Sequence, residues 1–164
     1  LSVQASKNAG VTITGALDDT AACLLGGLVV TDNSSNSLLS RKIVDDDYSI
    51  LLHVPEPKNY TRDVDLSNSD KFEESIDAII SMALNGNYLN AMSLNGMIFS
   101  KILKQSDAAS ILALKSNALS AGLSGTGPSV AAICNSDTKS SIIDSWKSLD
   151  GDIITAKINN AEGL

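Results

Sequence analysis

Two short segments of this sequence carry residue types that could handle phosphates and protons. The first is the run Ser124-Gly125-Thr126-Gly127-Pro128, in which two glycines flank a hydroxyl residue. Because glycine has no Cβ, the backbone N–H groups of such a loop can approach an anion closely. Taken alone, this pattern slightly favours an ordinary turn and leaves phosphate binding as the alternative. It is not a Walker A loop, since no Gly-Lys-Ser or Gly-Lys-Thr follows.

The second segment is Gly15-Ala16-Leu17-Asp18-Asp19, which is followed by Gly26 and Gly27. Adjacent acids at the start of an apolar helix can do no more than interact favourably with the positive end of its dipole. A carboxylate near a phosphate loop could instead accept the proton of a substrate hydroxyl. The residues by themselves favour the first interpretation and leave the second open.

Three other features are weaker candidates. Arg62 lies in a polar stretch, where its guanidinium could bind a substrate carboxylate through two parallel hydrogen bonds, although a surface arginine is the simpler interpretation. His53 is the sole histidine and has no pattern of triad or metal-ligand partners, so we expect a structural role. Asp45, Asp46 and Asp47 lack the spacing of a calcium loop and are expected to form a solvated turn.

The elements that must position these residues follow from apolar spacing and turn signals. Helical spacing predicts helices over 18–25, 69–86, 88–103, 107–117 and 137–146. We expect Ser69 or Asp70 to cap the second of these and Asp137 the last. Apolar runs bounded by turn residues predict strands at 28–30, 48–54, 130–134 and 153–158, with another short strand before the glycine loop.

From Tyr48 onward, with the additional helices set aside, this order is βαββαβ, which is typical of a ferredoxin-like α+β domain. Residues 1–46 do not belong to that unit and are expected to end a preceding domain, so that a second domain covers 47–164. The chain begins with Leu1 and enters a structured pattern at once, as a truncated polypeptide would.

Composition narrows the function classes. The 164 residues include 43% hydrophobic residues, enough to build a core. A net charge of −7 argues against nucleic acid and anionic membrane surfaces as partners. No apolar stretch approaches the ~20 residues needed to span a bilayer. Cys23 and Cys134 both lie in apolar runs, so we expect buried free thiols and a cytoplasmic protein.

The run Gly122-Leu123-Ser124-Gly125-Thr126-Gly127-Pro128-Ser129 resembles the third motif of the GHMP kinases, a superfamily of small-molecule kinases. The stretch from Ala9 to Asp19, with Gly26-Gly27 and Val30-Thr31-Asp32-Asn33 after it, resembles the archaeal shikimate kinase branch of that superfamily. Tyr60-Thr61-Arg62-Asp63-Val64-Asp65 adds to the likeness.

The resemblance implies a GHMP kinase C-terminal ferredoxin-like domain, preceded by the tail of a ribosomal-protein-S5-like N-terminal domain. It also implies ATP-dependent phosphorylation of the shikimate 3-hydroxyl, a step of aromatic amino-acid biosynthesis. By the family's spacing, Asp19 would be the catalytic base. The implied phosphate-binding residues are Ser124, Gly125, Thr126 and Gly127. The implied substrate-binding residues are Gly15, Asp18, Arg62 and Thr126.

The partners implied are ATP, shikimate and an N-terminal ATP-binding half that is not in these residues. The family's second, phosphate-wrapping motif does not occur in this sequence, so we expect the chain alone to be inactive. Mg²⁺ would serve the full enzyme through ligands outside the chain. Two alternatives stay open: a homoserine kinase-like enzyme of the same fold, and a non-catalytic half that acts only as a structural partner.

Overall fold

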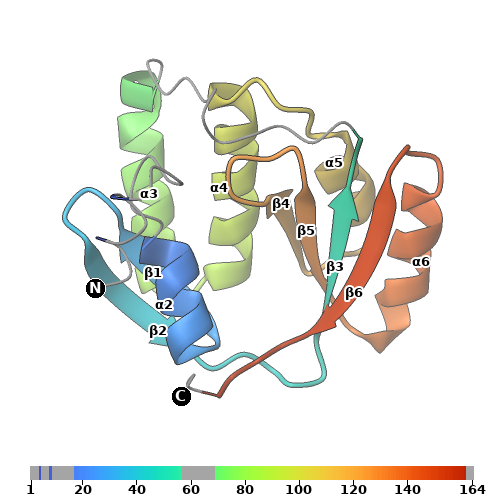
Figure 1. Ribbon diagram of the computed structural model, residues 1–164, viewed down its shortest axis with the longest axis horizontal. Coiled ribbons are helices and arrows are strands. Elements are labelled where there is room, and N and C mark those ends of the chain that lie inside the picture. Colours follow the sequence, from blue (N-terminus) through green and yellow to red (C-terminus); the bar gives the residue numbers. More distant parts are fainter. Residues whose placement is uncertain (1–3, 5–7, 9–16, 57–68, 162–164) are drawn as a thin grey trace.

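The computed structural model describes residues 4, 8, 17–56 and 69–161, and two of the predicted site residues, Gly15 and Arg62, lie outside them. Two parts are distinguished in Figure 1: a helix with a β-hairpin near the N-terminus, and a sheet with its helices over the rest of the chain.

The N-terminal part consists of α2 (Leu17–Leu25), β1 (Leu28–Asp32) and β2 (Ser37–Lys42), with β1 and β2 paired antiparallel. The helix and the first strand are confirmed. The second strand escaped prediction because polar residues, including Arg41 and Lys42, interrupt its apolar pattern. Its turn is closed by the Asp32 carboxylate, which accepts hydrogen bonds from the hydroxyls of Ser34 and Ser35, at 2.6 Å each. These bonds lower the pKa of Asp32 to about 2.

The main sheet has four antiparallel strands in the order β4-β5-β3-β6. They are β3 (Ser49–Val54), β4 (Ser120–Leu123), β5 (Val130–Cys134) and β6 (Asp152–Lys157). The first and third strands of the unit are central, and the second and fourth are at the edges. This arrangement confirms the ferredoxin-like α+β prediction.

Among the described residues, the helical segments of this unit are η2 (Ser69–Phe72), α3 (Glu73–Leu84), α4 (Tyr88–Ile102), α5 (Ala108–Lys115) and α6 (Ser136–Trp146). Helices α5 and α6 cover one face of the sheet, where Leu51, Ala132 and Ile142 are fully buried. Trp146 closes this core, with its indole Nε1 donating to the carbonyl oxygen of Ala109 at 2.8 Å. Among the described residues, no helix combines the length and the apolar character that crossing a bilayer requires.

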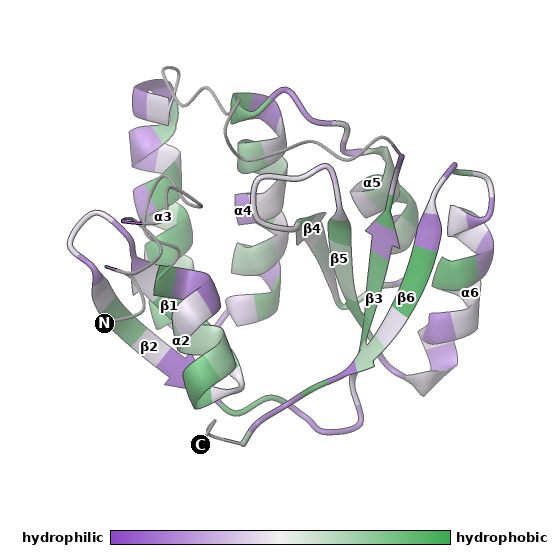
Figure 2. Ribbon diagram, viewed as in Figure 1, coloured by the Kyte–Doolittle hydropathy of each residue, from purple (hydrophilic) through white to green (hydrophobic). Residues whose placement is uncertain are grey.

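Colouring by hydropathy shows both polar and apolar residues along α3 and α6, as expected for amphipathic helices (Figure 2). Three local predictions were wrong. Asn135, not Asp137, caps α6, since its side chain accepts from the N–H groups of Asp137 and Thr138. Ser69 and Asp70 do not cap α3 but form a 3-10 turn in front of it. Cys23 is exposed, because α2 buries only its Ala21 side.

Candidate active site

The first turn of α2 presents two adjacent carboxylates. Asp18 is held in place, since Asn33 Nδ2 donates to its Oδ1 at 3.2 Å. Asn33 is in turn linked to Thr31, whose hydroxyl donates to Asn33 Oδ1 at 3.4 Å. The β1–β2 turn, which follows Asp18 by 15 residues, therefore fixes this carboxylate.

Asp19 has a different environment from its neighbour. Within the described residues, its carboxylate has no hydrogen-bond partner. Partial burial raises the pKa of Asp19, and the negative charge of Asp18 raises it further. A carboxylate with a raised pKa is a better proton acceptor than an ordinary aspartate. The two acids therefore differ in their surroundings, and the role of Asp19 as a base stays a prediction.

The glycine-containing turn joins β4 to β5. It is closed by two backbone hydrogen bonds: Ser124 N–H donates to the Ser129 carbonyl at 2.8 Å, and Gly127 N–H donates to the Ser124 carbonyl at 3.0 Å. Gly125 has a φ of +57° and Gly127 a φ of +76°, a region that favours glycine. Residues 124–129 therefore form a turn, as their residue pattern alone favoured. Whether this turn binds an anion stays an open prediction.

The two glycines differ in what surrounds them. A Cβ built on Gly127 would lie 2.8 Å from Leu123 Cδ1 and 3.1 Å from Gln105 Cγ, so this glycine is packed. A Cβ built on Gly125 would have no atom within 4 Å. The backbone at Gly125 thus faces open space, which an anion could occupy.

Residues that sequence reasoning missed hold this turn in place. Gly96 of α4 packs directly against Gly122 of β4, and a Cβ on Gly96 would collide with Gly122 Cα. Beside it, the buried hydroxyl of Ser93 lies 2.9 Å from Ser120 Oγ and accepts from Ala121 N–H at 3.1 Å. The sequence feature that could have revealed this packing is Gly96, a glycine within an otherwise helical stretch, with Ser93 and Ser100 on the same helix face.

The two candidate segments belong to different parts of the molecule. Helix α2 packs on β1 and β2, whereas the 124–129 turn extends the main sheet beside α4 (Figure 1). Gly15 and Arg62, which would complete the substrate site, lie outside the described residues. That Asp19 and the glycine turn form one joint site stays a prediction.

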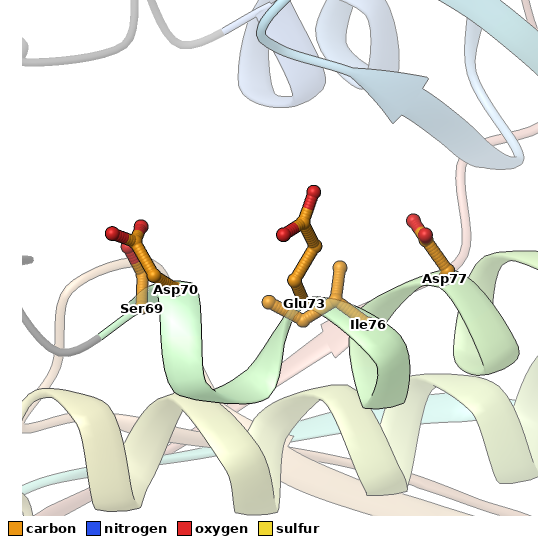
Figure 3. A pocket seen from close by; sticks show the side chains of 5 residues that line it. All are labelled: Ser69, Asp70, Glu73, Ile76 and Asp77. Carbon is orange, nitrogen blue, oxygen red and sulfur yellow. The ribbon is translucent and has the colours of Figure 1, made fainter.

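A pocket of about 260 Å³ opens along η2 and α3, lined by Ser69, Asp70, Glu73, Ile76 and Asp77. Its carboxylates all project from the same side of these helices (Figure 3). Concentrated negative charge repels phosphate, so this pocket is not the anion site. Nor does the described part of the chain contain a group of three acidic, histidine or cysteine side chains able to hold a metal ion. Because Mg²⁺ in kinases is held by one or two carboxylates together with substrate phosphates, the Mg²⁺ expected for the full enzyme stays a prediction.

His53 lies on the core face of β3, only 4% exposed, with its ring centroid 5.7 Å from that of Trp146. Its Nε2 has no hydrogen-bond partner. Burial lowers the pKa of His53. These surroundings agree with the expected structural role.

Comparison with known proteins places this geometry in a family. Residues 72–150 match the family model described as GHMP kinases C terminal. The chain is 41% identical to a shikimate kinase of Methanothrix thermoacetophila over 160 residues, which covers 98% of the chain and 55% of that enzyme. It is 36% identical to a shikimate kinase of Methanococcoides burtonii, covering all of the chain and 57% of that enzyme. The chain thus spans about half the length of the curated relatives it matches.

Solved structures agree on the fold. Mevalonate kinase of L. major superposes with a TM-score of 0.61 at 20% identity, covering 93% of this chain and 54% of that one. A homoserine kinase described as putative, from Listeria monocytogenes, superposes with a TM-score of 0.56 at 18% identity, covering 87% and 52%. At these identities the likeness concerns architecture alone.

Proposed function

Since this chain belongs to the GHMP kinases through its C-terminal family domain, we propose that it takes part in the ATP-dependent phosphorylation of the shikimate 3-hydroxyl. The observation that carries the proposal is the 41% identity to a shikimate kinase along 98% of the chain. The match covers 98% of the chain, so it extends beyond residues 72–150, the part that matches the family model.

In the proposed reaction Asp19 accepts or orients the proton of the attacking hydroxyl. Its raised pKa and its lack of a protein partner among the described residues suit that role. Asp18, restrained by Asn33, hydrogen-bonds a second hydroxyl of the substrate ring. We assign Gly15 and Arg62 to the same substrate site, with the Arg62 guanidinium paired to the shikimate carboxylate.

The turn between β4 and β5 contacts the phosphate being transferred. Gly125 faces open space among the described residues, and we assign Ser124, Gly125, Thr126 and Gly127 to the contact with phosphate oxygens. Phosphoryl transfer depends chiefly on positioning and on stabilising negative charge, so a fixed turn and one carboxylate are a meaningful share of the machinery. ATP supplies the phosphoryl group.

The test is a kinase assay on the complete gene product and on the 164-residue chain, with shikimate and homoserine as competing acceptors and ADP release as the readout. The complete product should phosphorylate shikimate at about 1–100 per second. We expect the 164-residue chain alone to be inactive. As a matched control, the chain is fused to the part of the Methanothrix thermoacetophila enzyme that it does not match. Preference for homoserine, or no activity in either form, would contradict the proposal.

A further inference from the structure

The C-terminal segment after β6 returns to the N-terminal part of the molecule. Beyond Lys157 the chain leaves the main sheet and runs to the end of α2 and the end of β2 (Figure 1). We call residues 158–161 the C-terminal strap. Within it, Ile158 and Asn160 are half-buried, although neither belongs to a helix or strand.

Asn160 is the main anchor of the strap. Its Nδ2 donates to the Val44 carbonyl at 2.7 Å, and its Oδ1 accepts from the Val44 N–H at 3.0 Å. The side-chain amide therefore pairs with a backbone amide in both directions, as a neighbouring strand would. Nδ2 also donates to a carboxylate oxygen of Asp46.

The strap also holds the end of α2. Gly27 N–H donates to the Asn159 carbonyl at 2.7 Å. Arg41 of β2 bridges the residue after α2 and the strap. Its Nε donates to the Gly26 carbonyl at 3.1 Å, and its Nη2 donates to the Asn160 carbonyl at 3.0 Å. These bonds tie Gly26 and Gly27, which directly follow α2, to the strap and to β2.

Close backbone approach explains the Gly26-Gly27 pair. Both residues have positive φ, +67° and +73°. A Cβ on Gly26 would collide with the carbonyl oxygen of Ala161, and a Cβ on Gly27 would lie 2.5 Å from that of Lys42. The space at the end of α2 is thus filled by the strap on one side and by β2 on the other.

We propose that the C-terminal strap positions the acidic first turn of α2, with Asn160 as its positioning residue. This proposal rests on the proposed function for its catalytic consequence. Asp19 lies seven residues before Gly26, about 10 Å along a helix. A tilt of about 6° at the Gly26 end would therefore move Asp19 by about 1 Å, and displacements of that size can lower a rate about 10²-fold.

The test compares Asn160→Ala with Asn159→Ala in the complete gene product. Asn159→Ala is the matched control, because the Asn159 side chain is exposed and its hydrogen bond among the described residues, accepted from Ala161 N–H, stays within the strap, while its backbone carbonyl is retained. Asn160→Ser serves as a milder second variant if Asn160→Ala folds poorly. Two readouts are needed: amide hydrogen exchange at Gly27, with Leu51 of the core as reference, and the kinetic constants for both substrates.

We expect Asn160→Ala to speed exchange at Gly27 about tenfold or more, with exchange at Leu51 unchanged. The kcat should fall about 10- to 100-fold while both KM values stay within about twofold. Asn159→Ala should change neither readout. Unchanged exchange at Gly27, equal effects in the two variants, or faster exchange with normal kcat would each overturn the strap proposal. A wild-type protein without kinase activity would refute the proposed function, and the exchange result would still decide whether the strap fixes α2.

Discussion

Gly96 of α4 and Gly122 of β4 pack backbone against backbone, so closely that a Cβ on Gly122 would lie 3.0 Å from Gly96 Cα. This contact presses α4 onto the edge strand that leads into the glycine turn. The packing of α4 against Gly122 thus fixes the position of β4, and with it the position of the 124–129 turn.

Gly96→Ala tests this contact. Alanine normally favours a helix over glycine by about 1 kcal/mol. Here the added methyl group would meet backbone atoms that cannot rotate away, so overpacking should prevail and lower the free energy of unfolding by about 1–3 kcal/mol. Urea unfolding followed by Trp146 fluorescence measures this. Asn95→Ala, an exposed neighbour on α4, is the control and should lie within about 0.5 kcal/mol of wild type. A stabilised Gly96→Ala protein would show that the helix moves freely.

Asp19→Asn should lower kcat by roughly 10²–10⁴-fold with little change in shikimate affinity, because the amide keeps the shape but cannot accept a proton. Asp18→Asn should have a smaller effect on turnover. Steady-state kinetics of the complete gene product with both variants give the ranking. An inactive Asp18→Asn beside an active Asp19→Asn would place the base one residue earlier.

Gly125→Ala and Gly127→Ala should separate binding from folding. At Gly125 the added methyl group points into open space, so the cost to folding is about 1–2 kcal/mol of backbone strain, and the apparent KM for ATP should rise. At Gly127 the methyl group also meets Leu123 and Gln105, so the loss of stability should be larger. Thermal unfolding and ATP titrations distinguish the two. Equal stability losses would argue against the open space at Gly125.

The pH dependence of stability should report on His53. Burial lowers the pKa of His53 below 6.5, the usual value for a histidine. As the pH falls, the unfolded chain therefore binds a proton on His53 before the folded chain does. The contribution of neutral His53 to the free energy of unfolding is complete above pH 6.5 and is lost as the pH falls toward the lowered pKa. The slope contributed by one such group is at most about 1.4 kcal/mol per pH unit. His53→Gln removes this titration. The free energy of unfolding in urea, measured between about pH 7.5 and 5.5, should therefore depend less on pH in this variant than in the wild type. Parallel profiles would mean that the imidazole is solvated.

Much of the secondary structure could be predicted from the chain alone, because it depends on local patterns. The apolar spacing from Tyr88 to Leu103 predicted α4, and the run at 130–134 predicted β5, each nearly to its observed ends. The strand and helix order then implied the ferredoxin-like sheet. Residue type and spacing marked Asp19 and the glycine turn as candidates, and the family resemblance supplied their roles, which remain predictions.

Tertiary structure decided what depends on neighbours distant in the sequence. Strand β2 is mostly polar and becomes a strand through its pairing with β1. Cys23 is exposed because of which side of α2 meets the hairpin. The tie between Asn160 and Val44 spans 116 residues, and no local pattern announces it. Residue spacing determines local conformation, whereas burial and hydrogen bonding across the fold depend on which surfaces meet, and that is settled only when the whole chain packs.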